Sequence, residues 1–112
     1  MHELAITCNI VELAEEAANG RRVHRVTIEI GELSGVLPDA ITFCFPEVAN
    51  GTCLQDAFLE IRRIDALARC SGCGSEFRTP EITTVCPCGS LDFVRLSGEE
   101  LNIKSIELEE AA

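Results

Sequence analysis

The chain has 112 residues, of which 46% are hydrophobic, and 19 acidic residues against 9 lysines and arginines give it a net charge of −10. This length suits one domain, or a domain with a small added module, and the strong negative charge disfavours nucleic acid as a partner. No stretch approaches the roughly 18 to 20 consecutive apolar residues of a transmembrane helix. The acidic N-terminus also lacks the basic start of a secretory signal, so we expect a cytoplasmic protein without a membrane partner.

The N-terminal segment predicts a helix over residues 3–19 that buries two faces. Apolar residues recur there at helical spacing in two stripes, and Asn19-Gly20 supplies a stop signal. The stripes are Ile6, Ile10, Leu13 and Ala17, and Leu4, Cys8 and Val11. We expect such a helix to lie between a sheet and another element. Strict alternation then predicts a strand over residues 23–31, with Val26, Ile28 and Ile30 facing inward and Thr27 outward.

A second helix is expected to begin near Pro38, because the first turn of a helix tolerates proline. The apolar residues at helical spacing in this segment are Leu37, Ile41, Cys44, Phe45 and Val48. Pro46 lies inside the pattern, so we expect it to kink or shorten the helix. Asn50-Gly51 then provides the end signal.

Two further strands are expected over residues 57–64 and 101–108, and a cysteine-rich insert separates them. The simplest topology makes these strands neighbours, with the insert projecting from their ends. The expected fold class is α+β: a three-stranded sheet with two helices in βαβ order, plus an inserted zinc-ribbon-like module with four cysteines. The predicted domains are an α+β domain over 1–67 and 97–112 and a metal-binding domain over 68–96.

Four of the seven cysteines cluster in the insert, as Cys70-Ser-Gly-Cys73 and Cys86-Pro-Cys88. Reducing compartments disfavour disulfides, whereas four thiolates from two separated turns match a tetrahedral structural Zn²⁺ site. A closed set of four thiolates leaves no open position for catalysis. The second pair is C-x-C rather than C-x-x-C, so we expect it to lack the N–H···S hydrogen bonds of an ordinary knuckle. A redox-active dithiol, or a set of inert cysteines, is the alternative.

The remaining features argue against nucleic-acid binding and catalysis. The insert balances three arginines with three acidic residues before any thiolate is counted, which does not make a phosphate-binding surface. The chain has no Ser/His/Asp set, no glycine-rich phosphate loop and only two histidines, so an enzyme is not expected. Cys8 and Cys44 lie on apolar helix faces, and we expect them to be small buried hydrophobic residues.

The chain opens with Met1-His2-Glu3, directly before the first predicted helix. The Met1 amine, the His2 backbone nitrogen and the His2 ring can together wrap one metal ion. Such nitrogen donors suit Ni(II) or Cu(II), which favour square-planar or tetragonal sites. Taken alone these three residues are a weak signal, because many proteins begin with a polar residue before a helix.

Several features in one order resemble the HypA/HybF family of nickel metallochaperones, which mature [NiFe] hydrogenase. They are the Met1-His2-Glu3 start, the segment Gly31-Glu-Leu-Ser34-Gly-Val36, a helix with Phe43 and Phe45, Gly51-Thr52, and a four-cysteine insert before a terminal strand. The resemblance covers nearly the whole chain. It implies a nickel-binding domain made from both chain ends and a zinc domain formed by the insert. It also implies two partners, the accessory GTPase HypB and the hydrogenase large-subunit precursor.

Carried over by residue, the resemblance makes His2 the principal nickel ligand, with the Met1 amine and the backbone nitrogens of His2 and Glu3 beside it. It makes Cys70, Cys73, Cys86 and Cys88 the ligands of a structural Zn²⁺. Two departures stand out: the family usually has C-P-x-C-G where this chain has CPCG, and no histidine flanks the cysteines. Some members place an aspartate near nickel, for which Asp39 is the candidate, although a carboxylate at a helix N-terminus is the alternative reading.

The sequence therefore predicts a non-enzymatic carrier of Ni(II) with a structural zinc. The alternative is a zinc-ribbon interaction adaptor without nickel transfer, or a thiol-redox protein. The sequence leaves open which hydrogenase is served, the nickel affinity, and whether the chain is a monomer or a dimer.

Overall fold

The computed structural model describes residues 2–110, and their contacts divide the chain into two compact units. Within those residues the first unit comprises the segment up to Glu29, Val36–Arg62 and the segment from Asn102 onward. The second unit comprises Ile30–Gly35 and Arg63–Leu101. The second unit thus contains the insert and a short segment that ends 28 positions before Arg63 in the sequence.

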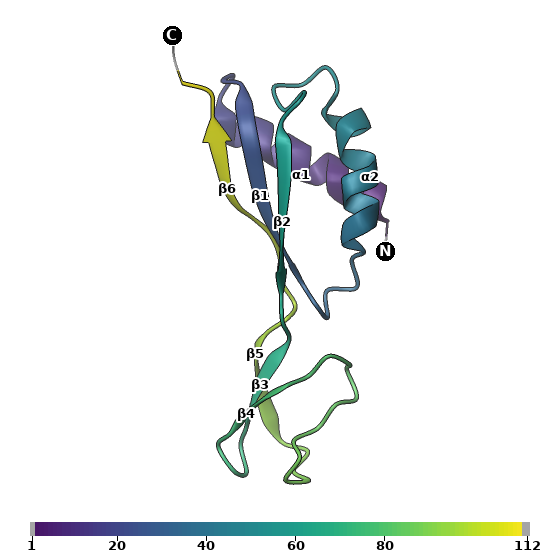
Figure 1. The fold of residues 1–112 in the computed structure, drawn as a ribbon, viewed down its shortest axis with the longest axis vertical. Coiled ribbons are helices and arrows are strands. Elements are labelled where there is room, and N and C mark those ends of the chain that lie inside the picture. The colour runs from purple at the N-terminus through teal and green to yellow at the C-terminus, as the bar shows by residue number, and fades with distance from the viewer. Residues whose placement is uncertain (1, 111–112) are drawn as a thin grey trace. The chain divides into compact units, whose positions relative to one another are not determined.

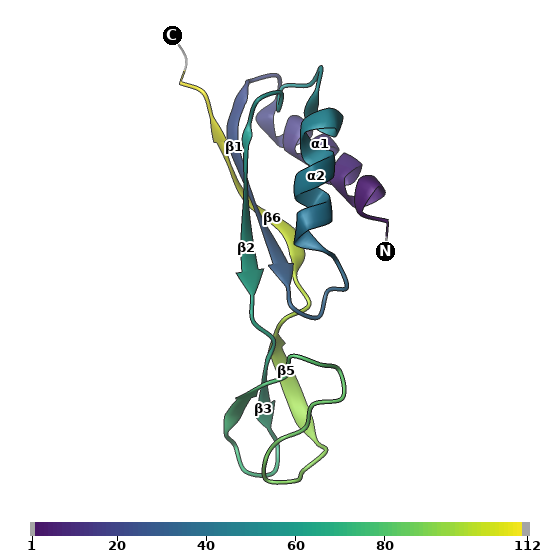
Figure 2. The same ribbon diagram turned by 45° about the vertical axis from the view of Figure 1, so that its right-hand side comes forward.

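The first unit is built on a three-stranded sheet with the strand order β2-β1-β6. Its strands are β1 (Val23–Gly31), β2 (Phe58–Ile64) and β6 (Leu101–Leu108). Strands β1 and β2 run in the same direction and β6 runs in the opposite one, as Figure 2 shows. Both helices lie on the same side of this sheet (Figures 1 and 2). The connection from β1 through a helix to β2 is therefore the expected βαβ unit.

The expectation that β2 and β6 are neighbours is wrong, because β1 lies between them. The physical reason is burial. Strand β1 carries Val23, Val26, Ile28 and Ile30, all of which are buried. The central strand of a small sheet is the best-covered position, so the most apolar strand occupies it, and the less apolar β2 and β6 form the edges.

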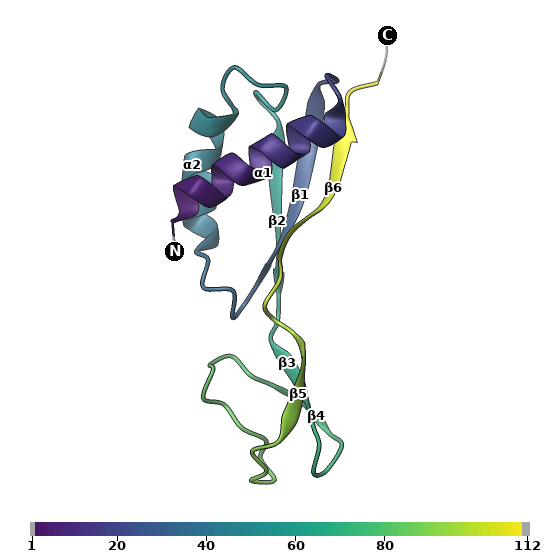
Figure 3. The ribbon, with the colours of Figure 1, turned by 180° about the vertical axis from the view of Figure 1, so that it is seen from behind.

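Helix α1 (Glu3–Ala18) ends at Asn19, which adopts a left-handed conformation with φ 51° as its C-cap. Its buried residues are Thr7, Ile10, Val11, Ala14 and Ala18, and Figure 3 shows the helix lying across α2 and the sheet. The prediction of two buried faces is wrong, because Leu4 is 59% exposed and Cys8 is also exposed. One side of α1 is buried, and each predicted stripe lies only partly on it: Ile10 and Val11 are buried, whereas Leu13 of the first stripe is 48% exposed.

Helix α2 (Pro38–Ala49) contacts α1, and its buried residues are Ile41, Phe45 and Ala49. It continues for three residues beyond Pro46, so the proline does not end the helix, which stops at the expected Asn50. Pro46 and Thr42 are both exposed, and the Thr42 carbonyl that proline leaves without an N–H partner can therefore be hydrated. The buried Phe45 and Ala49 hold the last turn in place.

The sheet face away from the helices is covered by polar side chains. Arg25 lies within ion-pair distance of Glu60 (3.8 Å) and Glu107 (3.9 Å), and its guanidinium stacks over the Phe58 ring. Thr27 faces this side as expected, but it is buried and its hydroxyl donates to a Glu60 carboxylate oxygen at 2.9 Å. This network gives the sheet a solvated outer face rather than a second apolar one.

The second unit carries its own three-stranded antiparallel sheet in the order β4-β3-β5. Its strands are β3 (Leu67–Cys70), β4 (Glu76–Arg78) and β5 (Phe93–Ser97). The Phe77 and Phe93 rings meet edge to face with centroids 5.8 Å apart. With this inserted sheet and its cysteines, the predicted α+β fold class with a zinc-ribbon-like four-cysteine module is confirmed.

The segment Ile30–Gly35 is fixed to the insert by backbone contact and by one acidic side chain. Glu32 accepts hydrogen bonds from the Ala66 N–H at 2.9 Å and from the Arg78 guanidinium at 2.9 and 3.0 Å. Gly31 contacts the Gly98 backbone so closely that a Cβ would overlap it. Gly98 has φ +118°, and a Cβ there would lie 2.5 Å from the Cβ of Ala66. Glycine is therefore required at both positions.

Neither helix in the described part of the chain has the length and apolar character that crossing a membrane requires.

Candidate metal centre

The second unit brings the four predicted cysteines together. Cys70 ends β3, Cys73 follows in the β3–β4 turn, and Cys86 and Cys88 come from the long β4–β5 loop. The Sγ atoms of Cys70 and Cys88 are 3.5 Å apart, those of Cys73 and Cys86 are 3.6 Å apart, and all four lie within 4.8 Å of one another. A tetrahedral zinc site with Zn–S bonds near 2.3 Å has sulfurs about 3.8 Å apart. The donor set therefore fits a tetrahedral ion.

Backbone amides support the first knuckle. The N–H groups of Gly72 and Cys73 point at the Cys70 sulfur at 3.3 and 3.4 Å. The Cys73 N–H, and less strongly that of Gly72, lower the pKa of the Cys70 thiol to about 6. A thiol with this pKa is largely ionised at neutral pH, so one donor of the site is prepared for a cation.

Two serines that the sequence reading missed also act on the sulfurs. The Ser75 hydroxyl lies 2.9 Å from the Cys73 sulfur and, with the Ser75 N–H, lowers the pKa of that thiol. In the shortened knuckle, the Ser90 N–H likewise acts to lower the pKa of the Cys88 thiol. Both knuckles read Cys-Gly-Ser, with Gly74 at φ +76° and Gly89 at φ +90°, and this repeat was the available signal. The CPCG knuckle thus keeps an N–H group directed at sulfur, contrary to the expectation from its spacing.

The four thiols cannot all ionise without a cation. The Ser90 N–H lowers the pKa of the Cys88 thiol, but hydrogen bonding with the sulfurs of Cys86 and Cys70 raises it further in the opposite direction, to about 12. Each sulfur that loses its proton makes ionisation of its neighbours harder. A divalent ion at the centre of the four sulfurs removes this conflict. Among the described residues, this is also the one group of three or more His, Cys, Asp or Glu side chains close enough to hold an ion.

His2 lies in the first unit, at the start of α1. It is the N-cap residue with an extended backbone (φ −87°, ψ 92°), it is exposed, and its side chain makes no capping hydrogen bond. Its carbonyl accepts the Ile6 N–H at 3.1 Å. A helix provides no internal acceptor for its first N–H groups, so the His2 and Glu3 nitrogens are not used by α1. The predicted Met1 ligand lies outside the described residues.

The Glu3 side chain connects the start of α1 to the start of α2. Its carboxylate accepts the Leu37 N–H at 3.4 Å, and Leu37 is the N-cap of α2. Asp39 is exposed in the first turn of the same helix. The structure therefore brings Glu3 to the end of α2 that carries Asp39, although these residues are 36 positions apart. An acidic residue near the positive end of a helix is favourable for either of them.

The fold and the cysteine group define a small α+β protein with an inserted metal-binding module. The family model described as hydrogenase/urease nickel incorporation, metallochaperone, hypA, matches residues 1–108, and the chain belongs to this family. The family resemblance predicted from the sequence is confirmed. The family's members are metallochaperones that serve metalloenzyme maturation, so the expectation that this chain is not an enzyme is confirmed as well.

Individual relatives agree with this assignment. A protein of Nostoc sp. named hydrogenase maturation factor HypA is 49% identical over 110 residues, which are 98% of this chain and 97% of the relative. A protein of the same name from Geobacter metallireducens is 47% identical, covering 97% of this chain and all of the relative. The solution structure of the Ni metallochaperone HypA from Helicobacter pylori superposes with a TM-score of 0.67 at 25% identity, covering 96% of this chain and 97% of that one.

Proposed function

We propose that this chain carries Ni(II) at its N-terminus for [NiFe] hydrogenase maturation, while a structural Zn²⁺ holds the insert. The nickel donors are the His2 ring, the backbone nitrogens of His2 and Glu3, and the Met1 amine. The observation that carries the proposal is the state of His2: it is exposed, it does not cap α1, and it precedes amides that the helix leaves unpaired. Planar nitrogen donors of this kind suit Ni(II).

Release is as important to a carrier as binding. A site built from the first residues of the chain has few ligands and faces solvent, so a partner can approach it and compete for the ion. The Glu3–Leu37 hydrogen bond keeps this end of α1 beside α2, so that the carboxylates of Glu3 and Asp39 balance the positive charge of the ion. In this proposal both carboxylates orient and neutralise the site, and the nitrogens bind the ion.

The zinc in this proposal is bound by Cys70, Cys73, Cys86 and Cys88 and takes no part in chemistry. The sulfur distances support it, as do the glycine turns and the amides directed at sulfur. Reduced thiols are needed for this site, which is why we place the chain in the cytoplasm. The partners we propose are the accessory GTPase HypB and the hydrogenase large-subunit precursor.

A calorimetric titration of zinc-loaded protein with Ni(II) tests the nickel site. Protein with a native N-terminus should bind one nickel, and His2→Ala should abolish that binding while zinc content stays the same. His24→Ala is the matched control, because His24 is also an exposed histidine of the same unit but lies in β1. One residue added before Met1 converts the amine to an amide and should act like His2→Ala. Native affinity in either altered protein would leave a zinc-containing adaptor as the better description.

A further inference from the structure

The inserted module exposes more apolar surface than its size suggests. Five of its large hydrophobic side chains are exposed, namely Ile82, Val85, Leu91, Val94 and Leu96. Val94 and Leu96 differ from the others because they belong to a strand, β5, in which Leu96 lies at the irregularity where the pairing with β3 passes from Arg95 to Ser97. They are 60% and 42% exposed. The strand that carries them is therefore the part of the module with an ordered apolar surface.

The pairing register explains why this face is open. Arg69 of β3 is paired with Val94 on one side and with Glu76 on the other, and paired residues of antiparallel strands share a face. The opposite face holds Ala68, Phe77 and Phe93, and the Arg95 guanidinium reaches the buried Thr79 at 3.4 Å there. The β4–β5 loop thus covers the face of the sheet that holds Phe77, and the face that holds Val94 stays exposed.

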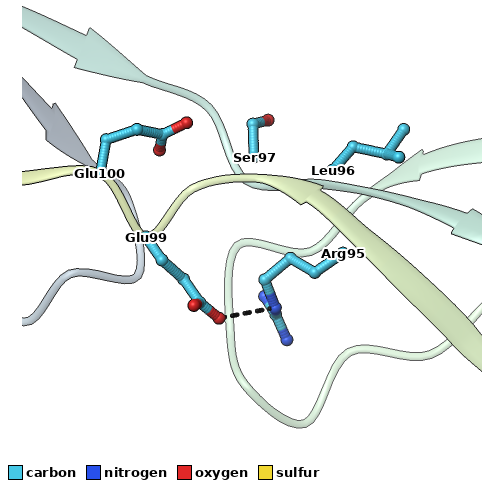
Figure 4. A pocket seen from close by; sticks show the side chains of 5 residues that line it. All are labelled: Arg95, Leu96, Ser97, Glu99 and Glu100. Carbon is cyan, nitrogen blue, oxygen red and sulfur yellow. Dashed lines mark ion pairs between the residues drawn. The ribbon is translucent and has the colours of Figure 1, made fainter.

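Strand β5 is also at the edge of its sheet. In the described part of the chain it pairs with β3 alone, so the hydrogen-bonding groups on its other side have no strand partner. A hollow of about 320 Å³ lies at the end of this strand, lined by Arg95, Leu96, Ser97, Glu99 and Glu100 (Figure 4). Leu96 and Ser97 lie on one side of the strand there, and the Arg95–Glu99 ion pair (3.0 Å) lies on the other.

The charges beside β5 indicate what kind of chain fits. Asp92 immediately precedes the strand and is exposed, and Glu99 and Glu100 follow it. Glu99 is 68% exposed, so its single ion pair leaves it accessible to a second cation. Carboxylates thus lie at both ends of a five-residue strand whose apolar residues are Phe93, Val94 and Leu96. The two acidic ends are on the order of 20 Å apart at the rise of an extended chain.

We propose that the free edge of β5 binds an extended segment of a partner protein, with apolar residues at its centre and a lysine or arginine at each end. The mode is strand addition: backbone hydrogen bonds to β5 supply affinity, and Val94, Leu96 and the acidic ends supply selectivity. A second copy of this chain does not suit the surface, because its own β5 would bring the same acidic ends together. The inference goes beyond nickel carriage and involves neither metal ion.

The test uses the full chain and two synthetic peptides followed by backbone amide NMR. In one peptide threonine and valine alternate between two terminal lysines, and the matched peptide ends in two glutamates. The lysine peptide should shift the amide signals of residues 91–101 in a saturable way and should bind at least tenfold more tightly than the glutamate peptide. Added salt should weaken it, because the selectivity depends on exposed charges.

Two variants test whether the lysine peptide binds at Val94 and Leu96 of β5. Val94→Lys and Leu96→Lys should each weaken binding of the lysine peptide at least fivefold. Ile82→Lys is the matched control, because Ile82 is 80% exposed in the same module but lies in the β4–β5 loop, and it should bind normally. Unchanged β3 and β4 signals in the peptide-free protein will verify that the inserted module of each variant is folded.

Equal binding of both peptides, shifts outside β5, or no binding at all would overturn the proposal. Shifts of the β5 signals that depend on protein concentration without peptide would identify a second copy as the occupant and would overturn it as well. No nickel is present in this titration, so its outcome is independent of the N-terminal site.

Discussion

Replacing Gly98 with alanine tests whether the contact between Gly98 and Ala66, at the base of the insert, is as close as the structure shows. Two costs apply. The φ of +118° is one that side-chain-bearing residues rarely adopt, which costs about 1–3 kcal/mol. The new Cβ would also lie 2.5 Å from the Cβ and 2.6 Å from the Cα of Ala66, and relieving such overpacking costs about 1–3 kcal/mol. We expect Gly98→Ala to destabilise the second unit by about 2–6 kcal/mol in total.

Gly51→Ala separates the two costs. Gly51 has φ +81°, but a Cβ there meets no atom within 4 Å, so only the conformational cost of about 1–2 kcal/mol applies. A second control is Gly98→Ala combined with Ala66→Gly. It removes the nearer of the two clashing atoms but leaves the Cα, so it should recover part of the stability.

Urea unfolding followed by NMR amide signals is the suitable assay, because the chain has no tryptophan or tyrosine for fluorescence. Signals of β3 and β5 report on the second unit, and those of α1 report on the first. A Gly98→Ala protein whose second unit unfolds at the same urea concentration as the native one would refute the reasoning. So would a loss no greater than that caused by Gly51→Ala in its own unit.

Three further predictions concern the ions and the charges. Removing zinc with a chelator, or replacing Cys73 with alanine, should abolish slow amide exchange in β3, β4 and β5 while α1 keeps its protection. The reason is that the module has few apolar residues to hold it folded without the ion. Full protection of these strands in the zinc-free protein would contradict this prediction. Nickel affinity should fall at least tenfold as the pH is lowered from about 7.5 to 6, because protons compete for the imidazole and amide nitrogens, and a flat titration curve would point to carboxylates as the ligands. The Ala66 N–H and the Arg78 guanidinium hold the pKa of Glu32 below its usual 4.5, so this group stabilises the folded state above that pH and its contribution is lost as the pH falls through the lowered value. Arg78→Ala should therefore flatten the acid side of the stability profile measured on the β3 signals, whereas Arg69→Ala, which removes the exposed pair with Glu76, should leave it unchanged.

The sequence was sufficient wherever structure depends on a local pattern. Alternation located β1 because Val26, Ile28 and Ile30 are all buried, and the cysteine spacing located the metal centre because two tight turns each supply two donors. The N-terminal start and the four-cysteine insert also carried the family resemblance. These signals need only a few consecutive residues, and no knowledge of distant contacts.

The errors and omissions concern contacts between distant residues. Strand order depends on which strand buries the most surface, and periodicity alone does not rank β1 against β2. The exposure of Leu4 and Cys8 depends on what lies opposite α1, which its own sequence does not record. The pairing of Glu32 with Arg78 joins residues 46 positions apart, and either residue alone looks like an ordinary surface charge.

This pairing has a consequence for how the insert can be gained or lost. Leu67 and Ser97 are paired across β3 and β5, so the ends of the insert lie close enough to be joined by a short turn. Such a deletion would nevertheless remove Arg78, the partner of Glu32, and would disturb the Gly98 carbonyl that accepts the Leu33 N–H at 2.6 Å. The Gly31–Gly35 loop would then have to be remade at the same time. Natural or engineered chains that lose the cysteines should therefore have altered residues at 31–33 too, because the insert and residues 31–33 depend on each other for their contacts and should change together.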